Sequence, residues 1–193
     1  GVREVFKLFQ ISSNATFSVT PTATTTYYSI QSNSATVVSP VAAIEIKVNS
    51  LPNVLASATP ASICSGSTSK VSATGADTYK WNTTAGDVNP TSTTTYYVTG
   101  TDANSCTNTS SVIVTVNSAP NVIASANPAS ICVGNSSTIT ASGADSYIWS
   151  QPAGLVSPTS TTTYTVTGTS ANACVATASV VLTVRPVPTV TAS

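Results

Sequence analysis

The sequence predicts an all-β protein built from tandem antiparallel β-sandwich repeats. Apolar residues alternate with polar residues at a period of two, and no stretch shows the 3.6-residue period of an amphipathic helix. Pro, Gly and Asp interrupt these runs at short intervals, which is typical of turns between short strands. The third observation is a recurring segment: residues 90–100 read PTSTTTYYVTG and residues 158–168 read PTSTTTYTVTG.

This recurring segment belongs to a repeat with a period of 68 residues. Residues 52–119 align with residues 120–187 without a gap, and well over half of the aligned positions are identical. We therefore predict one small β-sandwich over residues 51–118 and a second over residues 119–186. Because the two copies are so similar, we expect them to share one role.

The two ends of the chain match the repeat only in part. Residues 1–50 fit its C-terminal half, and residues 187–193 resemble the start of a further copy. We therefore expect the chain to begin and end inside repeats of a longer array. Residues 1–11 match no repeat, and the sequence assigns them no role.

Within residues 51–118 the alternation predicts six or seven short strands in order. Turn residues such as Pro60, Gly75 and Pro90 separate them. Side chains two apart in a strand share a face, so each apolar pair is predicted to point into the core. The successive strands are marked by Val54, Ala56 and Ala58, by Val71 and Ala73, by Tyr79 and Trp81, by Val88, by Tyr96 and Val98, and by Val112, Val114 and Val116.

The predicted core of each repeat contains four large side chains from these strands. Aromatic and β-branched residues favour a half-buried pleated surface, and Thr and Ser occupy the alternate outward positions. The core residues are Tyr79, Trp81, Tyr96 and Val98 in the first copy and Tyr147, Trp149, Tyr164 and Val166 in the second.

Charge is scarce in this chain. Six basic and six acidic residues make up 6% of the sequence, whereas soluble domains carry about 25%. Binding to nucleic acid or to an anionic membrane surface requires clustered Lys and Arg, which the chain lacks. No apolar run reaches the ~18 residues of a membrane helix. We expect neither a nucleic-acid partner nor membrane insertion.

The residues needed for catalysis are also missing. The chain has no His, which removes the usual triads and His metal sites. Asp77 and Asp145 follow Gly in GADTY and GADSY, a pattern typical of turns, and Asp102 is replaced by Ser170 in the next copy. The many hydroxyl groups have no adjacent base to activate them. We predict that the protein is not an enzyme and needs no cofactor or metal.

Two strings carry a resemblance to a known family: ASICSGSTSKVSATGADTYKW and PTSTTTYYVTGTDANSCTNTSSVIVTV. A Trp on the third strand and a Tyr after a Thr-rich corner resemble the immunoglobulin-like sandwich. The strings are similar to the Ig-like and PKD-like repeats of large secreted bacterial surface adhesins, especially those that Bacteroidetes export by type IX secretion. This resemblance implies an extracellular, cell-surface location.

The four cysteines, Cys64, Cys106, Cys132 and Cys174, lack the spacing of a zinc site and predict a secreted disulfide framework. Cys64–Cys106 and Cys132–Cys174 would lie within repeats. However, an immunoglobulin-like sandwich places these partners at opposite ends of a strand, ~20 Å apart, whereas a disulfide tolerates about 7 Å between Cα atoms. A Cys64–Cys174 bridge between repeats is slightly favoured, and both pairings stay open. Cys106 and Cys132 would then pair with cysteines outside the numbered chain.

Three functions are consistent with these features. The first is a non-catalytic stalk or adhesive segment of a surface protein, whose partners are neighbouring repeats or copies of itself. The second is a subunit of an extracellular filament assembled by strand exchange. A carbohydrate-binding module that recognises surface glycans is less favoured, because aromatic residues are only 6% of the chain. Sequons that could accept sugar occur at Asn14, Asn82, Asn108 and Asn135.

Overall fold

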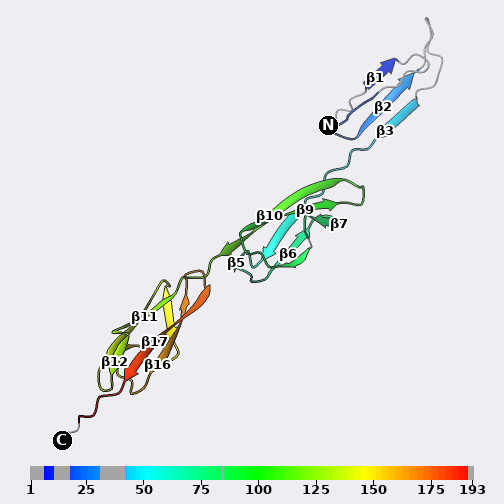
Figure 1. Ribbon diagram of the computed structural model, residues 1–193. Coiled ribbons are helices and arrows are strands. Elements are labelled where there is room, and N and C mark those ends of the chain that lie inside the picture. Colours follow the sequence, from blue (N-terminus) through cyan, green and yellow to red (C-terminus); the bar gives the residue numbers. More distant parts are fainter. Residues whose placement is uncertain (1–6, 11–17, 31–41, 84, 191–193) are drawn as a thin grey trace. The chain divides into compact units, whose positions relative to one another are not determined.

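The computed structural model describes residues 7–10, 18–30, 42–83 and 85–190, and every regular element in these ranges is a β-strand (Figure 1). The predicted fold class, all-β with immunoglobulin-like antiparallel sandwich repeats, is confirmed. Within the described ranges, no helix has the length and apolar character needed to cross a bilayer. The sequon at Asn14 lies outside the described residues.

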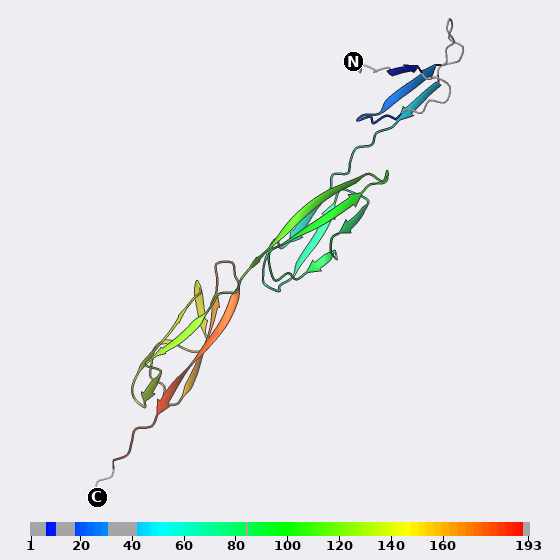
Figure 2. The ribbon, with the colours of Figure 1, turned by 45° about the horizontal axis from the view of Figure 1, so that its top comes forward.

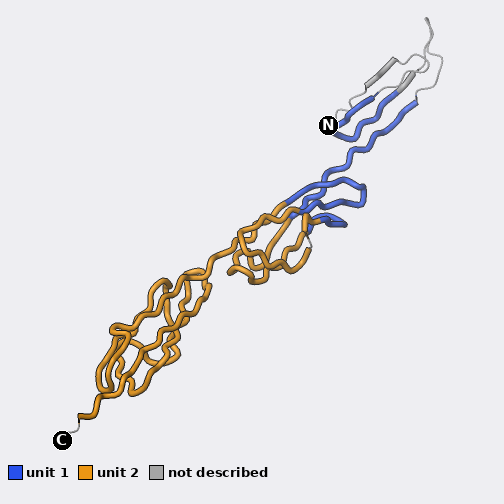
Figure 3. Tube along the Cα trace, viewed as in Figure 1, with its two compact units in different colours: residues 1–55, 74–80, 98–110 blue, residues 56–73, 81–97, 111–193 orange. Residues whose placement is uncertain are grey.

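The chain divides into two compact units (Figure 3). Unit 1 contains residues 1–55, 74–80 and 98–110, and unit 2 contains residues 56–73, 81–97 and 111–193. This division passes through residues 51–118, so it does not follow the boundaries expected from the 68-residue period. Those boundaries, including the partial repeats at residues 1–50 and 187–193, stay a prediction.

Residues before the first full repeat form a three-stranded sheet in the order β1-β2-β3. β1 pairs with β2 in parallel, and β2 pairs with β3 in the antiparallel sense. Ile44, which aligns with inward-facing Val112, is 67% exposed on β3. The strands are β1 (Lys7–Gln10), β2 (Thr25–Ile30) and β3 (Ala42–Ile46).

The next seven strands form two sheets, in the orders β4-β6-β8 and β5-β10-β9-β7. In unit 2 the two sheets share a core in which Val71 of one sheet packs with Ile63, Tyr96 and Val114 of the other. The strands are β4 (Leu55–Thr59), β5 (Ser62–Cys64), β6 (Ser69–Thr74), β7 (Thr78–Trp81), β8 (Gly86–Val88), β9 (Thr94–Thr101) and β10 (Thr107–Asn117).

The last seven strands repeat this topology, in the orders β11-β13-β15 and β12-β17-β16-β14. β16 and β17 run side by side in antiparallel register from Thr162↔Leu182 to Thr169↔Val175 (Figure 2). Ile131, Ile139, Tyr164 and Leu182 form the buried core between the two sheets. The strands are β11 (Ile123–Asn127), β12 (Ser130–Cys132), β13 (Ser137–Ser142), β14 (Ser146–Trp149), β15 (Gly154–Val156), β16 (Thr162–Thr169) and β17 (Val175–Arg185).

The short strands β5 and β12 were not among the strands marked by the sequence alternation. Both pair in parallel, β5 with β10 and β12 with β17, so the sheets are not purely antiparallel. A proline precedes each of them, Pro60 after β4 and Pro128 after β11. Because proline has no N–H to donate, the ladder stops there and the chain crosses to the opposite sheet.

Buried Ser hydroxyl groups fix these crossings. Ser69 and Ser137 are each 1% exposed, and they donate hydrogen bonds of 2.8 and 2.7 Å to the carbonyl oxygens of Pro60 and Pro128. A buried hydroxyl needs such a partner, because its transfer from water is otherwise costly. The same bond in both copies fixes the crossing from β4 to β5 and the crossing from β11 to β12.

The recurring Thr-rich segment has a structural role at the entry to β9 and β16. The side-chain oxygens of Thr93 and Thr161 accept hydrogen bonds of 3.0 and 3.1 Å from the N–H groups of Val116 and Val184. Thr24 accepts the equivalent bond from Val48, also at 3.1 Å. These hydrogen bonds attach each Thr-rich turn to the neighbouring strand. The Thr residue therefore recurs at the same position of each segment because its side chain bonds the backbone there.

The core prediction needs one correction. Tyr96, Val98, Tyr164 and Val166 are buried, with exposures of 5%, 1%, 4% and 0%. Trp81 and Trp149 are half-buried against the cores, and Tyr147 is half-buried. Tyr79, in contrast, is 36% exposed, so its assignment to the core is wrong.

Tyr79 lies on β7, an edge strand of its sheet, near the turn that precedes this strand. Its hydroxyl lies on the preceding turn, where it accepts a hydrogen bond from Ala76 N–H and donates one to Ala76 C=O, both 2.7 Å. Tyr147 makes the same two bonds with Ala144. The polar ends of these tyrosines therefore bond the turns that connect β6 to β7 and β13 to β14.

Candidate functional site

The structure joins Cys64 to Cys174 by a disulfide bond across a sequence separation of 110 residues, with 5.6 Å between the Cα atoms. Both residues belong to unit 2. This is the pairing between consecutive repeats that the distance argument favours. Cys106 and Cys132 are free thiols in this structure.

Cys64 occupies the end of a strand. It closes β5, where the parallel register places it opposite Asn117, the last residue of β10. Ser65 N–H donates to the carbonyl oxygen of Asn117 at 3.1 Å, and Asn117 Nδ2 donates to Ser62 Oγ at 2.8 Å. Backbone and side-chain bonds therefore hold the Cys64 backbone rigidly at the edge of the four-stranded sheet.

Cys174 occupies a tight turn that precedes β17. Ser170 N–H donates to Cys174 C=O and Ala173 N–H donates to Ser170 C=O, both at 2.9 Å. Ala173 adopts a positive φ of 60°, which a left-handed turn position requires. Asp145 Oδ2 accepts a 2.7 Å bond from Ala171 N–H, so this carboxylate anchors the turn. The Cys174 side chain is 1% exposed, and its sulfur lies 3.9 Å from the carbonyl oxygen of Asn117.

Cys132 repeats the environment of Cys64. It closes β12, and the parallel register places it opposite Arg185 at the end of β17. Val133 N–H donates to Arg185 C=O at 3.0 Å, which is the bond that Ser65 makes in the preceding copy. Here, however, the thiol is free and the residue is exposed.

Cys106 repeats the environment of Cys174. Asp102 N–H donates to Cys106 C=O and Ser105 N–H donates to Asp102 C=O, both at 3.0 Å, and Ser105 has a φ of 64°. Asp102 Oδ1 also accepts bonds of 2.9 Å from the N–H groups of Asn104 and Cys106. The thiol is free and half-buried.

The length of β17 explains why a bridge within one repeat does not form. Cys174 immediately precedes this 11-residue strand, and Cys132 lies opposite its last residue. At about 3.3 Å per residue, the strand separates the two cysteines by about 35 Å. A disulfide tolerates about 7 Å between Cα atoms. This distance is greater than the ~20 Å expected from the sequence, because β17 has 11 residues.

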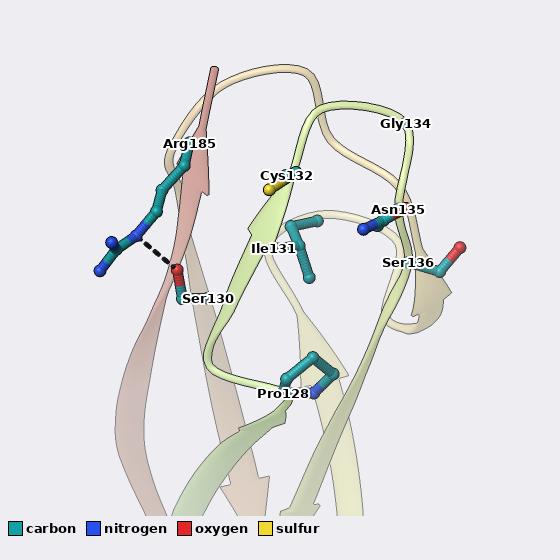
Figure 4. Close-up of a pocket in the computed structure, with 8 residues that line it drawn as sticks. All are labelled: Pro128, Ser130, Ile131, Cys132, Gly134, Asn135, Ser136 and Arg185. Carbon is teal, nitrogen blue, oxygen red and sulfur yellow. Dashed lines mark hydrogen bonds between the residues drawn. The ribbon is translucent and has the colours of Figure 1, made fainter. Parts of the chain in front are cut away.

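A shallow depression of about 630 Å³ lies beside Cys132 (Figure 4). Figure 4 shows Cys132 at the end of β12, beside the loop that carries Gly134 and Asn135. On the neighbouring strand, Arg185 Nε donates a 3.2 Å hydrogen bond to Ser130 Oγ. The lining residues are Pro128, Ser130, Ile131, Cys132, Gly134, Asn135, Ser136 and Arg185.

Sequence reasoning identified the cysteines but missed Ser130 and Arg185. These two residues are 55 positions apart and meet only through the parallel register of β12 and β17. No local sequence motif predicts the parallel register of β12 and β17. In the other copy Asn117 bonds Ser62 across the same spacing of 55 residues. This correspondence can be recognised only once the strand pairing is known.

The predicted turn residues Asp77, Asp102 and Asp145 lie between strands. The backbone N–H of Asp77 donates to Thr101 C=O, and the carboxylates of Asp102 and Asp145 accept hydrogen bonds from backbone N–H groups. In the described part of the chain, no three side chains of His, Cys, Asp or Glu gather in a way that could hold a metal ion. Of the sequon residues, Asn82 Oδ1 accepts a hydrogen bond from Tyr97 N–H, and Asn108 Nδ2 donates one to Pro52 C=O. Asn135 lines the depression beside Cys132.

Comparison with known proteins gives limited information. No family model matches the chain, and no curated protein matches it. Nine chains of solved structures match, among them one described as "PcdhgB3 EC1-4 in 50 mM HEPES". That match has 12% sequence identity and a TM-score of 0.25, and it covers 77% of this chain and 54% of the other. The chain therefore spans about half the length of that structure.

Proposed function

We propose that this chain is a non-catalytic structural or adhesive segment of an extracellular cell-surface protein, in which disulfide bonds link successive repeats. The observation that carries the proposal is the Cys64–Cys174 bond, which joins a strand end of one 68-residue copy to a turn of the next. Structural disulfides persist in oxidising compartments and are rare in the cytosol of most organisms, which supports an extracellular location.

The surface chemistry supports the same proposal. With 6% charged residues, the chain has no field that would steer a charged ligand. Outward positions of β16 are Thr163 and Thr165, which are exposed and uncharged. The finer assignment, to a surface adhesin of Bacteroidetes exported by type IX secretion, rests on the sequence resemblance alone.

The test uses intact cells of the source organism. We expect an antibody against the chain to label unpermeabilised cells, and externally added protease to remove the signal. Peptide mapping without reduction should recover Cys64 linked to Cys174 from the same cell-surface material. Signal only after permeabilisation, together with four free thiols, would contradict the proposal.

A second candidate is a subunit of an extracellular filament. Ile44 favours it, because this large apolar side chain is 67% exposed on β3, at the edge of the β1-β2-β3 sheet. An edge strand can accept a strand from another chain. Light scattering at increasing protein concentration distinguishes the two candidates: a filament subunit forms long assemblies that an Ile44→Lys variant does not form, whereas a repeat segment stays monomeric.

A carbohydrate-binding role has less support. Tyr97 is 57% exposed on the outer face of β9 and could stack on a sugar ring, but its counterpart in the next copy is Thr165. Binding of surface glycans therefore stays a prediction. A glycan array with the wild type and a Tyr97→Ser variant tests it directly.

A further inference from the structure

The Cys64–Cys174 disulfide joins two different structural elements, a strand end and a turn, which we call the strand-end half and the turn half of the joint. The chain also contains one copy of each half whose cysteine is free. The strand-end half is β5 with Cys64, and its unpaired copy is β12 with Cys132. The turn half is residues 170–174, and its unpaired copy is residues 102–106. The bonded pair therefore indicates which kind of partner each free cysteine would bind: a turn for Cys132 and a strand end for Cys106.

The surroundings of Cys132 match those of Cys64 closely. Shifting the eight lining residues of the depression by 68 positions leads to the residues around Cys64, and five of the eight are the same amino acid. The exceptions are Asn135, Ser136 and Arg185, which correspond to Ser67, Thr68 and Asn117. The five shared residues are Pro128, Ser130, Ile131, Cys132 and Gly134.

Burial distinguishes the paired cysteines from their free equivalents. Cys64 is half-buried, whereas Cys132 is exposed. Cys174 is 1% exposed, whereas Cys106 is half-buried. The backbone bonds from Ser65 to Asn117 and from Ser67 to Cys64 recur from Val133 to Arg185 and from Asn135 to Cys132. We therefore attribute the difference in burial to the bonded partners, which cover one another. The depression at Cys132 occupies the place that the Cys174 turn covers at Cys64.

We propose that the depression at Cys132 is the receiving seat for a cysteine-bearing turn of the same kind as residues 170–174, and that Cys132 forms a disulfide with the cysteine of that turn. The occupant is a polypeptide turn with the pattern Thr-x-Ala-Asn-x-Cys, which both residues 101–106 and residues 169–174 follow. This inference rests on the proposed function, because it names the partner of the linkage between repeats.

The chemistry is thiol–disulfide exchange. The Cys132 thiol loses its proton, and the thiolate attacks the sulfur of an incoming cysteine that is held in a mixed disulfide with a small thiol. A new S–S bond forms as the old one breaks, and the small thiol leaves with the electron pair and takes up the proton. No net oxidation is needed at this step, since the mixed disulfide brings the oxidised sulfur.

The neighbouring groups suit a polypeptide occupant. At the paired site, the Cys174 sulfur lies 3.9 Å from Asn117 C=O, the carbonyl at the end of β10. Arg185 C=O holds the same position at the end of β17. Gly134 leaves open space beside the seat, because a Cβ at this position would meet no atom within 4 Å. A turn backbone can therefore approach Cys132 without displacing a side chain.

The experiment uses the full chain with its Cys64–Cys174 bond intact. The probe is a synthetic peptide of residues 167–178, supplied as its mixed disulfide with glutathione. A peptide of the same composition in scrambled order is the matched control, and oxidised glutathione alone gives the baseline reactivity of each thiol. Mass spectrometry after proteolysis measures the mixed disulfide at Cys132 and, in the same molecule, at Cys106.

We expect Cys132 to react at least tenfold faster with the turn peptide than with the scrambled peptide, after division by the glutathione baseline. Cys106 should show no preference, because it belongs to the turn half. Denaturant should abolish the preference at Cys132. Equal rates with both peptides, or an equal preference at Cys106, would overturn the proposal.

A variant at the seat makes the test independent of general thiol accessibility. Asn135→Tyr places a large side chain in the exposed depression while its backbone N–H still donates to Cys132 C=O, as in the wild type at 3.0 Å. The variant should lose the peptide preference and keep the glutathione baseline. A retained preference would contradict the seat. If the cell-surface test fails while this selectivity holds, the location is wrong and the seat stands.

Discussion

Cys174 is bonded to Cys64, 110 residues earlier, and not to Cys132, which lies in the same sandwich. The β17 strand keeps Cys132 and Cys174 at opposite ends, whereas the Asn117 carbonyl lies beside the bonded Cys174 sulfur. The bond therefore connects two copies of the repeat that each have their own core. Its loss should affect stability without removing either core.

The Cys174→Ser variant should be less stable than the wild type under non-reducing conditions. An unfolded-state entropy model gives roughly 4–5 kcal/mol for a closed loop of this length. We expect the urea midpoint, followed by Trp fluorescence, to fall. Cys106→Ser is the matched control, because it changes a free cysteine in the equivalent turn, and it should shift the midpoint little. Equal shifts in both variants would argue against the bond.

Gly143→Ala should destabilise the protein by roughly 2–4 kcal/mol, in the range of backbone strain combined with steric conflict. Gly143 has a φ of +91°, and a Cβ there would lie 1.9 Å from the carbonyl oxygen of Asn121. Gly134→Ala is the control: its φ is +93°, but its Cβ would meet no atom within 4 Å. The difference between the two variants in chemical denaturation isolates the steric term, and equal losses would refute the close approach.

Ser137→Ala should cost about 1–3 kcal/mol, because the buried hydroxyl that bonds Pro128 C=O is removed. Ser136→Ala is a suitable comparison, since Ser136 is exposed and pairs with exposed Ser157. Its effect should stay within about 0.5 kcal/mol. Thermal unfolding of the two variants, measured under identical conditions, gives the difference. A larger loss for Ser136→Ala would be inconsistent with the described burial.

Val166→Ala should cost roughly 1–3 kcal/mol, since Val166 is fully buried and its loss leaves space in the core. The preceding residue, Thr165, faces outward and is exposed. Thr165→Ala should therefore change the free energy of unfolding by about 0.5 kcal/mol or less. Urea titrations of both variants test the inward and outward alternation along β16, which a similar effect of the two substitutions would contradict.

The alternation along each strand made the central part of the fold predictable. Tyr96 and Val98 lie on β9, which has a partner strand on each side, so the inward face of the strand is covered. Tyr79 follows the same alternation on β7, but its hydroxyl bonds the Ala76 backbone in the preceding turn, and the side chain is 36% exposed. Periodicity predicts which face of the strand a side chain lies on, but it does not predict that a polar group at the end of the side chain will bond a turn.

The linkage between the repeats was only partly predictable. The distance argument favours Cys64 with Cys174, but the sequence does not reveal the 11-residue length of β17 that makes the alternative so distant. β5 and β12 have three residues each, too few for a period to be recognised. Their parallel register, which brings Arg185 to Ser130, depends on the folding of the whole repeat.

The parallel pairing of β12 and β17 determines how this sandwich responds to tension. Cys132 is at the C-terminal end of β12, and Cys174 adjoins the N-terminal end of β17. Force applied outward through the two sulfur atoms draws the strands past one another along their axes. The interstrand hydrogen bonds are then loaded in shear, all at once, and cannot open one at a time as in a peeled hairpin.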